Sequence, residues 1–299
     1  MHRKRNAILK QIGLQIFLLL ITASVLFPIL WIFSMALDSR NIDKPLELTL
    51  IPPGASLAAF KRVLFEPFSQ LCKNPQDTST CMFFGKLLAN SLLVALGTSV
   101  FAVVLGSSAA YAFSRFKFIG RQAGMLGFIV LLMLPSTATL APLYVLLSLV
   151  KIGGEPLRAT LIGLMIAYAS GTLPFAIWNL KGYFDTIPKE LEEAALIDGC
   201  NVTSAFTRVI LPLSLPAMAI TILFSFMTGW TEFILAWTFL EDPARFTLAM
   251  ALRSMQGEYT TPWSDFSAMS ILMSIPIILI FYAFQRYIVS GLTLGGVKG

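Results

Sequence analysis

The chain has 299 residues, of which 56% are hydrophobic and 13% are charged, and its mean hydropathy is +0.77. A soluble domain carries about 25% charged residues, so this composition indicates a membrane protein. The only histidine is His2, which excludes histidine catalysis and histidine-based metal sites. For the same reason we expect no metal site. The basic residues behind the net charge of +6 lie mostly in short segments between apolar runs, as is usual beside membrane spans, so we expect no nucleic-acid partner.

Six apolar runs are long enough to cross a bilayer as helices, which takes about 17 to 25 residues. None of them alternates polar and apolar residues as the strands of a membrane barrel do. The sequence therefore predicts an all-α membrane protein in which residues 13–290 form one domain of six transmembrane helices. The expected spans are residues 13–37, 87–114, 122–150, 159–180, 209–240 and 266–285.

A short basic arm, residues 1–12, precedes the first apolar run. That run is much longer than the 7 to 15 residues or so of a secretion signal and no small-residue cleavage site follows it, so we expect a retained first span. The second short loop contains Arg115, Lys117 and Arg121 and no acidic residue. Positive charge beside spans marks the cytoplasmic side, so both chain ends and the loop between the fourth and fifth spans are expected there.

The loop of residues 38–86, between the first two spans, is expected on the outer side and contains Cys72 and Cys81. An oxidising exterior permits a disulfide, and no span contains cysteine, so we expect these two residues to pair. Cys200, on the cytoplasmic side, is expected to remain a thiol. Three scattered cysteines do not make a metal site.

Residues 184–212 are too polar for a further span and predict two short helices joined by a turn. Pro188 suits a first helical turn, Gly199 a left-handed stop, and Asn201 the cap of the second helix. Small and apolar residues beside acids favour docking into a cleft of another protein. The alternative is an amphipathic helix lying on the membrane, which would carry basic residues on its polar face, but acids outnumber bases here.

The same segment reads Glu193-Ala194-Ala195, three residues, Gly199, nine residues, then Val209, any residue and Leu211-Pro212. This pattern resembles the EAA loop of the membrane-spanning subunits of binding-protein-dependent ABC importers. The resemblance covers nearly the whole chain, including the glycine-rich tail of residues 291–299, and is nearest to the MalG-type permeases of maltose/maltodextrin transporters. Two departures are Val209, where isoleucine is usual, and the extended loop 38–86 with its two cysteines.

The resemblance implies the type I ABC importer permease fold, in a bacterial inner membrane. It implies three partners besides lipid: a second, MalF-like permease, a cytoplasmic ATPase dimer and an extracytoplasmic sugar-binding protein. ATP and Mg belong to the ATPase, and the chain, which has no G-x-x-x-x-G-K-[ST] phosphate loop, is expected to hold no cofactor and to catalyse no reaction. The implied ATPase contacts are Glu190, Glu193, Ala194, Ala195, Asp198, Gly199, Leu211 and Pro212, with Gly295, Gly296 and Lys298 of the tail.

One acidic residue, Glu232, lies within a predicted span. An ionisable group inside a membrane faces a cavity or a partner, and its neighbours offer hydroxyls and an indole ring to a sugar. The alternative is a bend in the fifth span that leaves Glu232 at the outer interface, with Trp237 in an aromatic belt. The expected lining of the sugar pathway is Glu232, Trp230, Thr231, Tyr168 and Asn179.

The last outer loop, residues 241–265, contains a polar and aromatic stretch that suits contact with a binding protein, or simple solvation. The candidate contacts are Gln256, Gly257, Glu258 and Tyr259.

Two other classes of protein remain as alternatives. A secondary transporter or channel would normally have several ionisable groups at the midplane, whereas this chain offers only Glu232. An intramembrane enzyme would need paired polar groups in facing spans, and the sequence has none.

Overall fold

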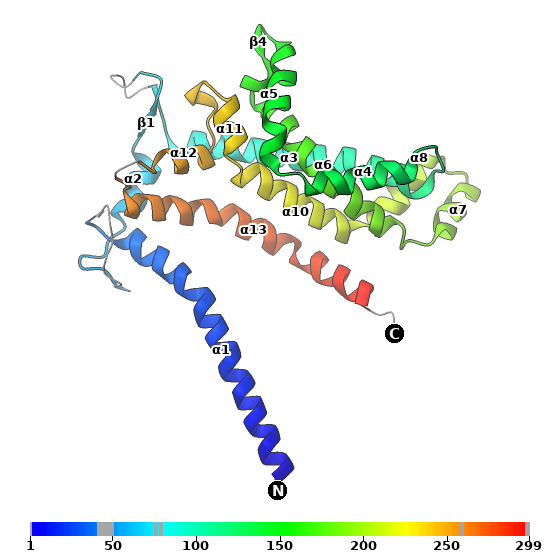
Figure 1. The fold of residues 1–299 in the computed structure, drawn as a ribbon, viewed down its shortest axis with the longest axis horizontal. Helices are drawn as coiled ribbons and strands as arrows, with labels where there is room; N and C mark the ends of the chain where they lie inside the picture. The colour runs from blue at the N-terminus through cyan, green and yellow to red at the C-terminus, as the bar shows by residue number, and fades with distance from the viewer. Residues whose placement is uncertain (1, 41–50, 75–76, 78–79, 258–259, 297–299) are drawn as a thin grey trace.

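The structure, a computed structural model, is built around four long helices and describes residues 2–40, 51–74, 77, 80–257 and 260–296 (Figure 1). Each of these four helices is long and apolar enough to cross a membrane without a break. The first is continuous through the predicted basic arm, and the last continues to Gly296, through much of the predicted tail. The four are α1 (His2–Leu37), α3 (Phe84–Arg115), α6 (Leu161–Phe184) and α13 (Trp263–Gly296).

The third apolar run is two helices rather than one. α4 (Arg121–Met133) ends before Leu134 and Pro135, and α5 (Leu140–Leu149) follows after one 3₁₀ turn, at an angle of 104° to α4. A residue before proline is pushed out of the helical region, and Leu134 is accordingly extended, with φ −74° and ψ 139°. The span predicted over residues 122–150 is therefore broken near its middle.

The fifth apolar run is broken twice. Its first part, Val202–Leu213, meets α10 (Leu215–Thr231) at an angle of 79°. α10 then ends at Glu232, whose backbone is extended, and α11 (Ile234–Phe239) follows. The span predicted over residues 209–240 is thus three pieces. If each bent pair of helices crosses the membrane as one, the described residues contain up to six spans.

At the centre of the molecule, α3, α6 and α10 pack along one another (Figure 1). Small residues permit the close approach of these helices. A Cβ atom on Gly106 of α3 would lie 2.9 Å from the Cβ of Ala176 on α6. A Cβ atom on Gly229 of α10 would lie 2.8 Å from the Cα of Ala95 on α3. A larger side chain at either glycine would force the helices apart.

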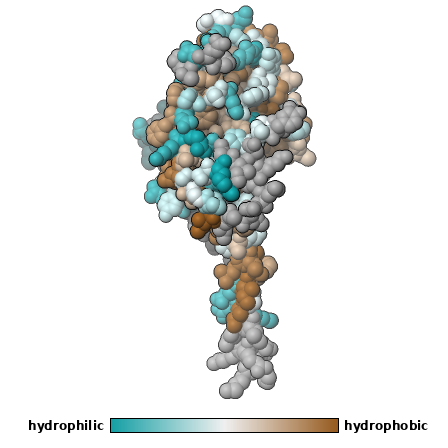
Figure 2. Space-filling model, turned by 90° about the vertical axis from the view of Figure 1, so that its left-hand side faces the viewer, coloured by the Kyte–Doolittle hydropathy of each residue, from teal (hydrophilic) through white to brown (hydrophobic). Residues whose placement is uncertain are grey.

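α1 differs from the other long helices because it packs against the rest of the chain only near its C-terminal end. Ser34 and Ala36 are buried, whereas the side chains of the most apolar stretch are all exposed. Figure 1 shows α1 diverging from α13, and Figure 2 shows its apolar surface projecting from the body of the molecule. This surface is left for lipid or for another protein to cover.

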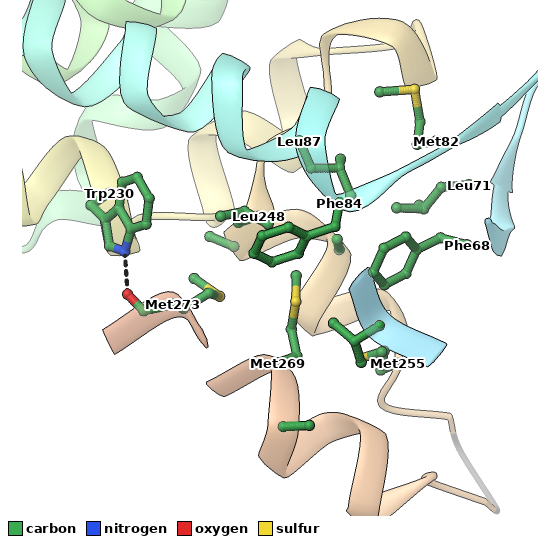
Figure 3. Packing of buried hydrophobic residues seen from close by; sticks show 14 of the residues in the cluster. Phe68, Leu71, Met82, Phe84, Leu87, Trp230, Leu248, Met255, Met269 and Met273 are labelled. Carbon is green, nitrogen blue, oxygen red and sulfur yellow. Dashed lines mark hydrogen bonds between the residues drawn. The ribbon is translucent and has the colours of Figure 1, made fainter. Parts of the chain in front are cut away.

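The end at which α3 and α13 begin, here called the β1–β2 end, carries a hairpin and two short helices. The strands are antiparallel, and a disulfide joins Cys72 to Cys81. An apolar cluster beneath them includes Phe68, Phe84 and Met269 (Figure 3). The elements are α2 (Ala58–Phe65), β1 (Phe68–Cys72), β2 (Cys81–Met82) and α12 (Leu248–Ser254).

α5 projects from the bundle at this same half of the molecule (Figure 1). Arg158 holds its base, because the guanidinium lies 4.5 Å over the ring of Tyr144 and 2.8 Å from the carboxylate of Glu241. The neighbouring short elements are η2 (Ser136–Thr139), β3 (Lys151–Ile152), β4 (Glu155–Pro156), η3 (Leu157–Ala159) and η5 (Pro243–Arg245).

The opposite end, here called the α7–α8 end, lies where α3 and α6 finish (Figure 1). Two short helices project there and lead back into the bundle through a turn of π-helix. The elements are α7 (Lys189–Ile197), α8 (Val202–Ala205), η4 (Phe206–Ile210) and α9 (Leu211–Leu213).

Candidate functional site

The helix pair at the α7–α8 end forms where local sequence signals predict it. Pro188 stands at the N-cap of α7, and two acids occupy its first turn, next to the positive end of the helix dipole. Gly199 ends the helix with φ +91°, a left-handed conformation that suits glycine. The side chain of Asn201 then accepts a hydrogen bond from the backbone N–H of Ser204 at 2.8 Å and caps α8.

A buried ion pair fixes α7 to the end of α3. Nε of Arg115 lies 2.8 Å from Oε2 of Glu192, and the two side chains are 6% and 13% exposed. The hydroxyl of Tyr111 donates to the other carboxylate oxygen of Glu192. Arg115 also donates to the carbonyl of Ile187, just before α7, at 3.1 Å. The carboxylate and the guanidinium are thus satisfied together, which is what a buried pair requires.

A second set of contacts holds the segment that leads into α7. The hydroxyl of Ser114 donates to Asp185 at 2.7 Å, and Lys181 pairs with the same carboxylate. The rings of Tyr111 and Phe206 lie 4.6 Å apart, so the π-helical turn also packs on α3. The helix pair is therefore anchored at its base to the ends of α3 and α6.

The outward surface of the pair, here called the α7–α8 face, is left uncovered. It combines acids with apolar side chains: Leu191 is 45% exposed, Ile197 86% and Val202 43%. Exposed apolar groups gathered beside charges are typical of interaction surfaces. The α7–α8 face consists of Glu190, Leu191, Glu193, Ala194, Ile197, Asp198 and Val202.

Most of the ATPase contacts predicted from the sequence lie on or beside this face. Gly199 and Pro212 are exposed, while Ala195 and Leu211 are partly buried. Gly295 and Gly296 belong to the last turn of α13, and Lys298 lies outside the described residues. Glu192, which the prediction did not include, is the acid that the fold uses internally.

A cavity of about 270 Å³ opens between α4, α6, α10 and α11, and is here called the central cavity. Leucines line much of its wall, with hydroxyl groups and one carboxylate among them. Such a mixture of apolar wall and few polar groups is typical of a small-molecule site. The polar lining side chains are Thr137, Thr139, Tyr168, Ser170, Thr172, Thr228 and Glu232.

Glu232 lies at the break between α10 and α11 and lines the central cavity. Its carboxylate accepts hydrogen bonds from the backbone N–H groups of Ile234 at 2.8 Å and Leu235 at 3.1 Å, and so caps α11. Its carbonyl accepts from the hydroxyl of Tyr168 at 3.0 Å. The fifth run bends here, as one alternative anticipated, and the bend places the acid on the cavity wall.

The other predicted pathway residues lie elsewhere. Trp230 is buried in the apolar cluster, where its indole N–H donates to the carbonyl of Met273 at 3.0 Å (Figure 3). Asn179 donates to the carbonyl of Ala217 and ties α6 to α10. Thr231 is exposed and donates to a carbonyl within its own helix. None of these three side chains lines the central cavity in this structure.

The expected lining of the sugar pathway did not include the threonines that line the cavity, although helical spacing offers a signal for two of them. Thr172 follows Tyr168 by one turn of α6, and Thr228 precedes Glu232 by one turn of α10. Residues four apart share a helix face. The stretch around Thr137 gives no such signal, because it is placed by the break after α4.

The candidate binding-protein contacts lie at the β1–β2 end. Gln256 accepts two hydrogen bonds from Arg253, both at 3.3 Å. The backbone N–H of Gly257 donates to the carbonyl of Thr260 at 3.2 Å and closes the turn. Glu258 and Tyr259 lie outside the described residues. In the part of the chain that the structure describes, no three metal-ligating side chains gather in one place.

Comparison with known proteins gives one family. Residues 102–294 match the model of the family described as binding-protein-dependent transport system inner membrane component. The chain is 34% identical over 304 residues to the maltose/maltodextrin transport system permease protein MalG of Yersinia pestis, covering 100% of this chain and 97% of that protein. It is 33% identical over 298 residues to the trehalose/maltose transport system permease protein MalG of Thermococcus litoralis, covering 99% of each.

Solved structures share the fold at lower identity. A chain of a bacterial ABC transporter involved in the import of the acidic polysaccharide alginate matches with a TM-score of 0.70 and 22% identity, over 92% of this chain and 95% of that one. A chain of the MetNI methionine ABC transporter matches with a TM-score of 0.53 and 17% identity, over 68% of this chain and 95% of that one. At these identities the likeness concerns the fold alone.

Proposed function

The chain belongs to the family of binding-protein-dependent transport system inner membrane components, and we propose that the importer it serves takes up a maltose/maltodextrin-like sugar. Membership makes it a multi-pass inner-membrane subunit of an ABC transporter that works with an ATPase and a periplasmic binding protein. The subunit itself is not catalytic and holds no cofactor. A secondary transporter and an intramembrane enzyme are thereby excluded.

One observation carries the sugar assignment: the likeness to permeases named for maltose, maltodextrin and trehalose extends over nearly the whole chain. The central cavity supports it in chemical terms, because its hydroxyl groups and the carboxylate of Glu232 suit a ligand rich in hydroxyls. Among the predicted pathway residues we keep Glu232 and Tyr168 for this role, and add Thr172 and Thr228.

We assign ATPase docking to the α7–α8 face, with the α7–α8 end in the cytoplasm. The basic residues that follow α3 support this orientation, and so does the disulfide at the far end of the molecule. The contacts that anchor Glu192 and Asp185 would carry a push on the face into α3 and α6. Opening and closing of the pathway would follow from that movement.

Two further partners complete the proposal. The apolar surface of α1 supports a second permease, MalF-like in kind, or lipid as its cover. The turn that contains Gln256 and Gly257 lies at the opposite end from the α7–α8 face, which suits contact with the binding protein.

Reconstitution tests the function. The chain, a second permease, the ATPase and the binding protein would be placed in liposomes, and ATP-dependent uptake of labelled maltose, maltotriose and trehalose measured. We expect uptake of at least one sugar, and none with an ATPase variant that cannot hydrolyse ATP. Co-purification with the ATPase but no uptake of any of the three would overturn the sugar assignment and leave the family role intact.

A further inference from the structure

A second open cavity lies at the β1–β2 end and has a different chemistry from the central cavity. Its volume is about 530 Å³, within the range of small-molecule sites. It lies between the hairpin, the break before α11, α11 itself and the end of α12. Figure 2 looks onto this end of the molecule, where hydrophilic side chains are interspersed with apolar ones. This cavity, here called the outer groove, is lined by Gln70, Phe233, Trp237, Arg253, Ser254 and Gln256.

The aromatic wall of the outer groove comes from one turn of chain. The backbone N–H of Trp237 donates to the carbonyl of Phe233 at 2.8 Å, so the two rings follow each other at helical spacing. Trp237 is 51% exposed, and among the described residues its indole N–H has no hydrogen-bond partner. An exposed indole with a free N–H offers both an apolar face and a donor.

Polar groups of the groove face the same space from other elements. The carboxamide of Gln70 on β1 is exposed, and no described residue bonds to it. Arg253 donates to the Oε1 of Gln256, which orients that carboxamide, and no described residue bonds to its nitrogen. No carboxylate of the described residues pairs with Arg253. The groove thus presents two amides and a guanidinium beside an aromatic wall.

This set of groups matches the chemistry of a pyranose ring. A sugar has an apolar face of C–H groups that packs on an aromatic ring, and hydroxyls on its edge that pair with amides and guanidinium. The hollow shape and the unpaired donors favour a small hydroxyl-rich ligand.

The outer groove and the central cavity share a wall. Phe233 and Trp237 line the groove, whereas Ile234 and Leu235 line the central cavity from another face of α11. The carboxylate of Glu232 holds the first turn of this six-residue helix. A small rotation of α11 would therefore change both cavities at once.

We propose that the outer groove is a sugar-binding subsite, which holds a hexose unit on Trp237 before the sugar enters the central cavity. The proposal rests on the sugar-import function proposed above. It adds a site on this chain for a ligand that the binding protein has released.

The test uses the complete transporter in liposomes, with maltotriose-loaded binding protein at saturating concentration. Two quantities would be measured: maltotriose taken up per ATP hydrolysed, and the stimulation of ATPase activity by the binding protein. The variants are W237A, Q70A and W237F. The matched control is W178A, since Trp178 is 50% exposed on α6 and lines neither cavity.

We expect W237A to lower uptake per ATP roughly two- to tenfold, the range expected for loss of one aromatic contact, with ATPase stimulation unchanged. Q70A should lower it less, W237F should restore most of it, and W178A should leave it as in the wild type. Equal uptake per ATP in W237A and wild type would contradict the proposed sugar subsite, while the proposed sugar-import function would stand.

Two other outcomes are distinct from these. A parallel fall of uptake and ATPase stimulation in W237A would identify the groove as a contact for the binding protein and overturn the sugar subsite. Failure of the wild-type transporter to take up maltotriose, maltose or trehalose would overturn the sugar function itself, and the groove proposal with it.

Discussion

The guanidinium of Arg115, in the last turn of α3, holds the carboxylate of Glu192, in the first half of α7, at 2.8 Å although 77 residues separate them in sequence. The bond joins the end of a long helix to the short helix that carries the α7–α8 face. The two residues thus connect the exposed α7–α8 face, the proposed ATPase contact, to the centre of the bundle.

Removal of one partner from this pair should loosen α7. Glu192→Ala would leave Arg115 buried without a counter-charge, and breaking a buried pair costs about 3–5 kcal/mol. We expect faster proteolysis between α6 and α8 and ATP hydrolysis that is poorly coupled to uptake. Glu193→Ala is the matched control, because Glu193 is exposed and should leave the proteolysis rate unchanged. Equal proteolysis in both variants would contradict the anchoring role.

Replacement of Gly199 should act through the backbone alone. No atom lies within 4 Å of where its Cβ would be, but φ is +91°, so a side chain introduces strain of about 1–2 kcal/mol. We expect Gly199→Val to lower the Tm and the coupling of ATP hydrolysis to uptake. Gly199→Asn should be milder, since asparagine tolerates the left-handed region. A Tm equal to wild type in the valine variant would show that the turn can adopt another conformation.

Trp230 should act as a stabilising residue and not as a sugar contact. Trp230→Phe removes the hydrogen bond to the carbonyl of Met273, at a cost of about 0.5–1.5 kcal/mol, and Trp230→Ala should cost about 3–5 kcal/mol. Thermal unfolding of the purified transporter, followed by size-exclusion chromatography, measures both. A phenylalanine variant with wild-type stability but altered sugar uptake would instead support Trp230 as a residue of the sugar pathway.

Close packing of α3 on α6 should make Gly106 intolerant of substitution. Even alanine would place its Cβ 2.9 Å from that of Ala176, so the helices must separate. Gly127→Ala on α4 is the control, since no atom lies within 4 Å of its Cβ position. We expect Gly106→Ala to lower the Tm, and Gly127→Ala to leave it unchanged or to raise it slightly. Comparable Tm values in the two variants would mean that α3 and α6 can separate slightly at little cost in stability.

The disulfide predicts a simple thiol count. In denaturant without reductant only Cys200 should react with a maleimide, and after reduction Cys72 and Cys81 should react as well. Mass spectrometry would give one label before reduction and three after it. Three labels in the unreduced protein would mean that the two cysteines are free.

Local signals explain which parts of the fold the sequence could predict. The start of α7 after Pro188, its stop at Gly199 and the cap at Asn201 depend on neighbouring residues, and the structure has each of them in place. The break after α4 has a local cause too, since Leu134 precedes a proline. The predicted spans did not include this break, because a long uncharged run indicates one span whether or not its helix is continuous.

Non-local contacts explain the rest. Glu190, Glu192 and Glu193 are alike in sequence, and only the position of Arg115 selects the one that is used internally. Trp230 stands two residues from Glu232, so sequence proximity suggested a shared role. Two steps of a helix turn the side chain by about 200°, however, and the indole therefore faces the apolar cluster while the acid faces the cavity.

The isolation of α1 has a consequence for how the protein is made. α1 leaves the ribosome well before its main partner within the chain, α13. At about 5–20 residues per second, the chain between Leu37 and Trp263 takes roughly 10 to 45 s to synthesise. During that time α1 lacks its main partner within the chain, so lipid or another protein must cover its apolar surface until α13 has been made.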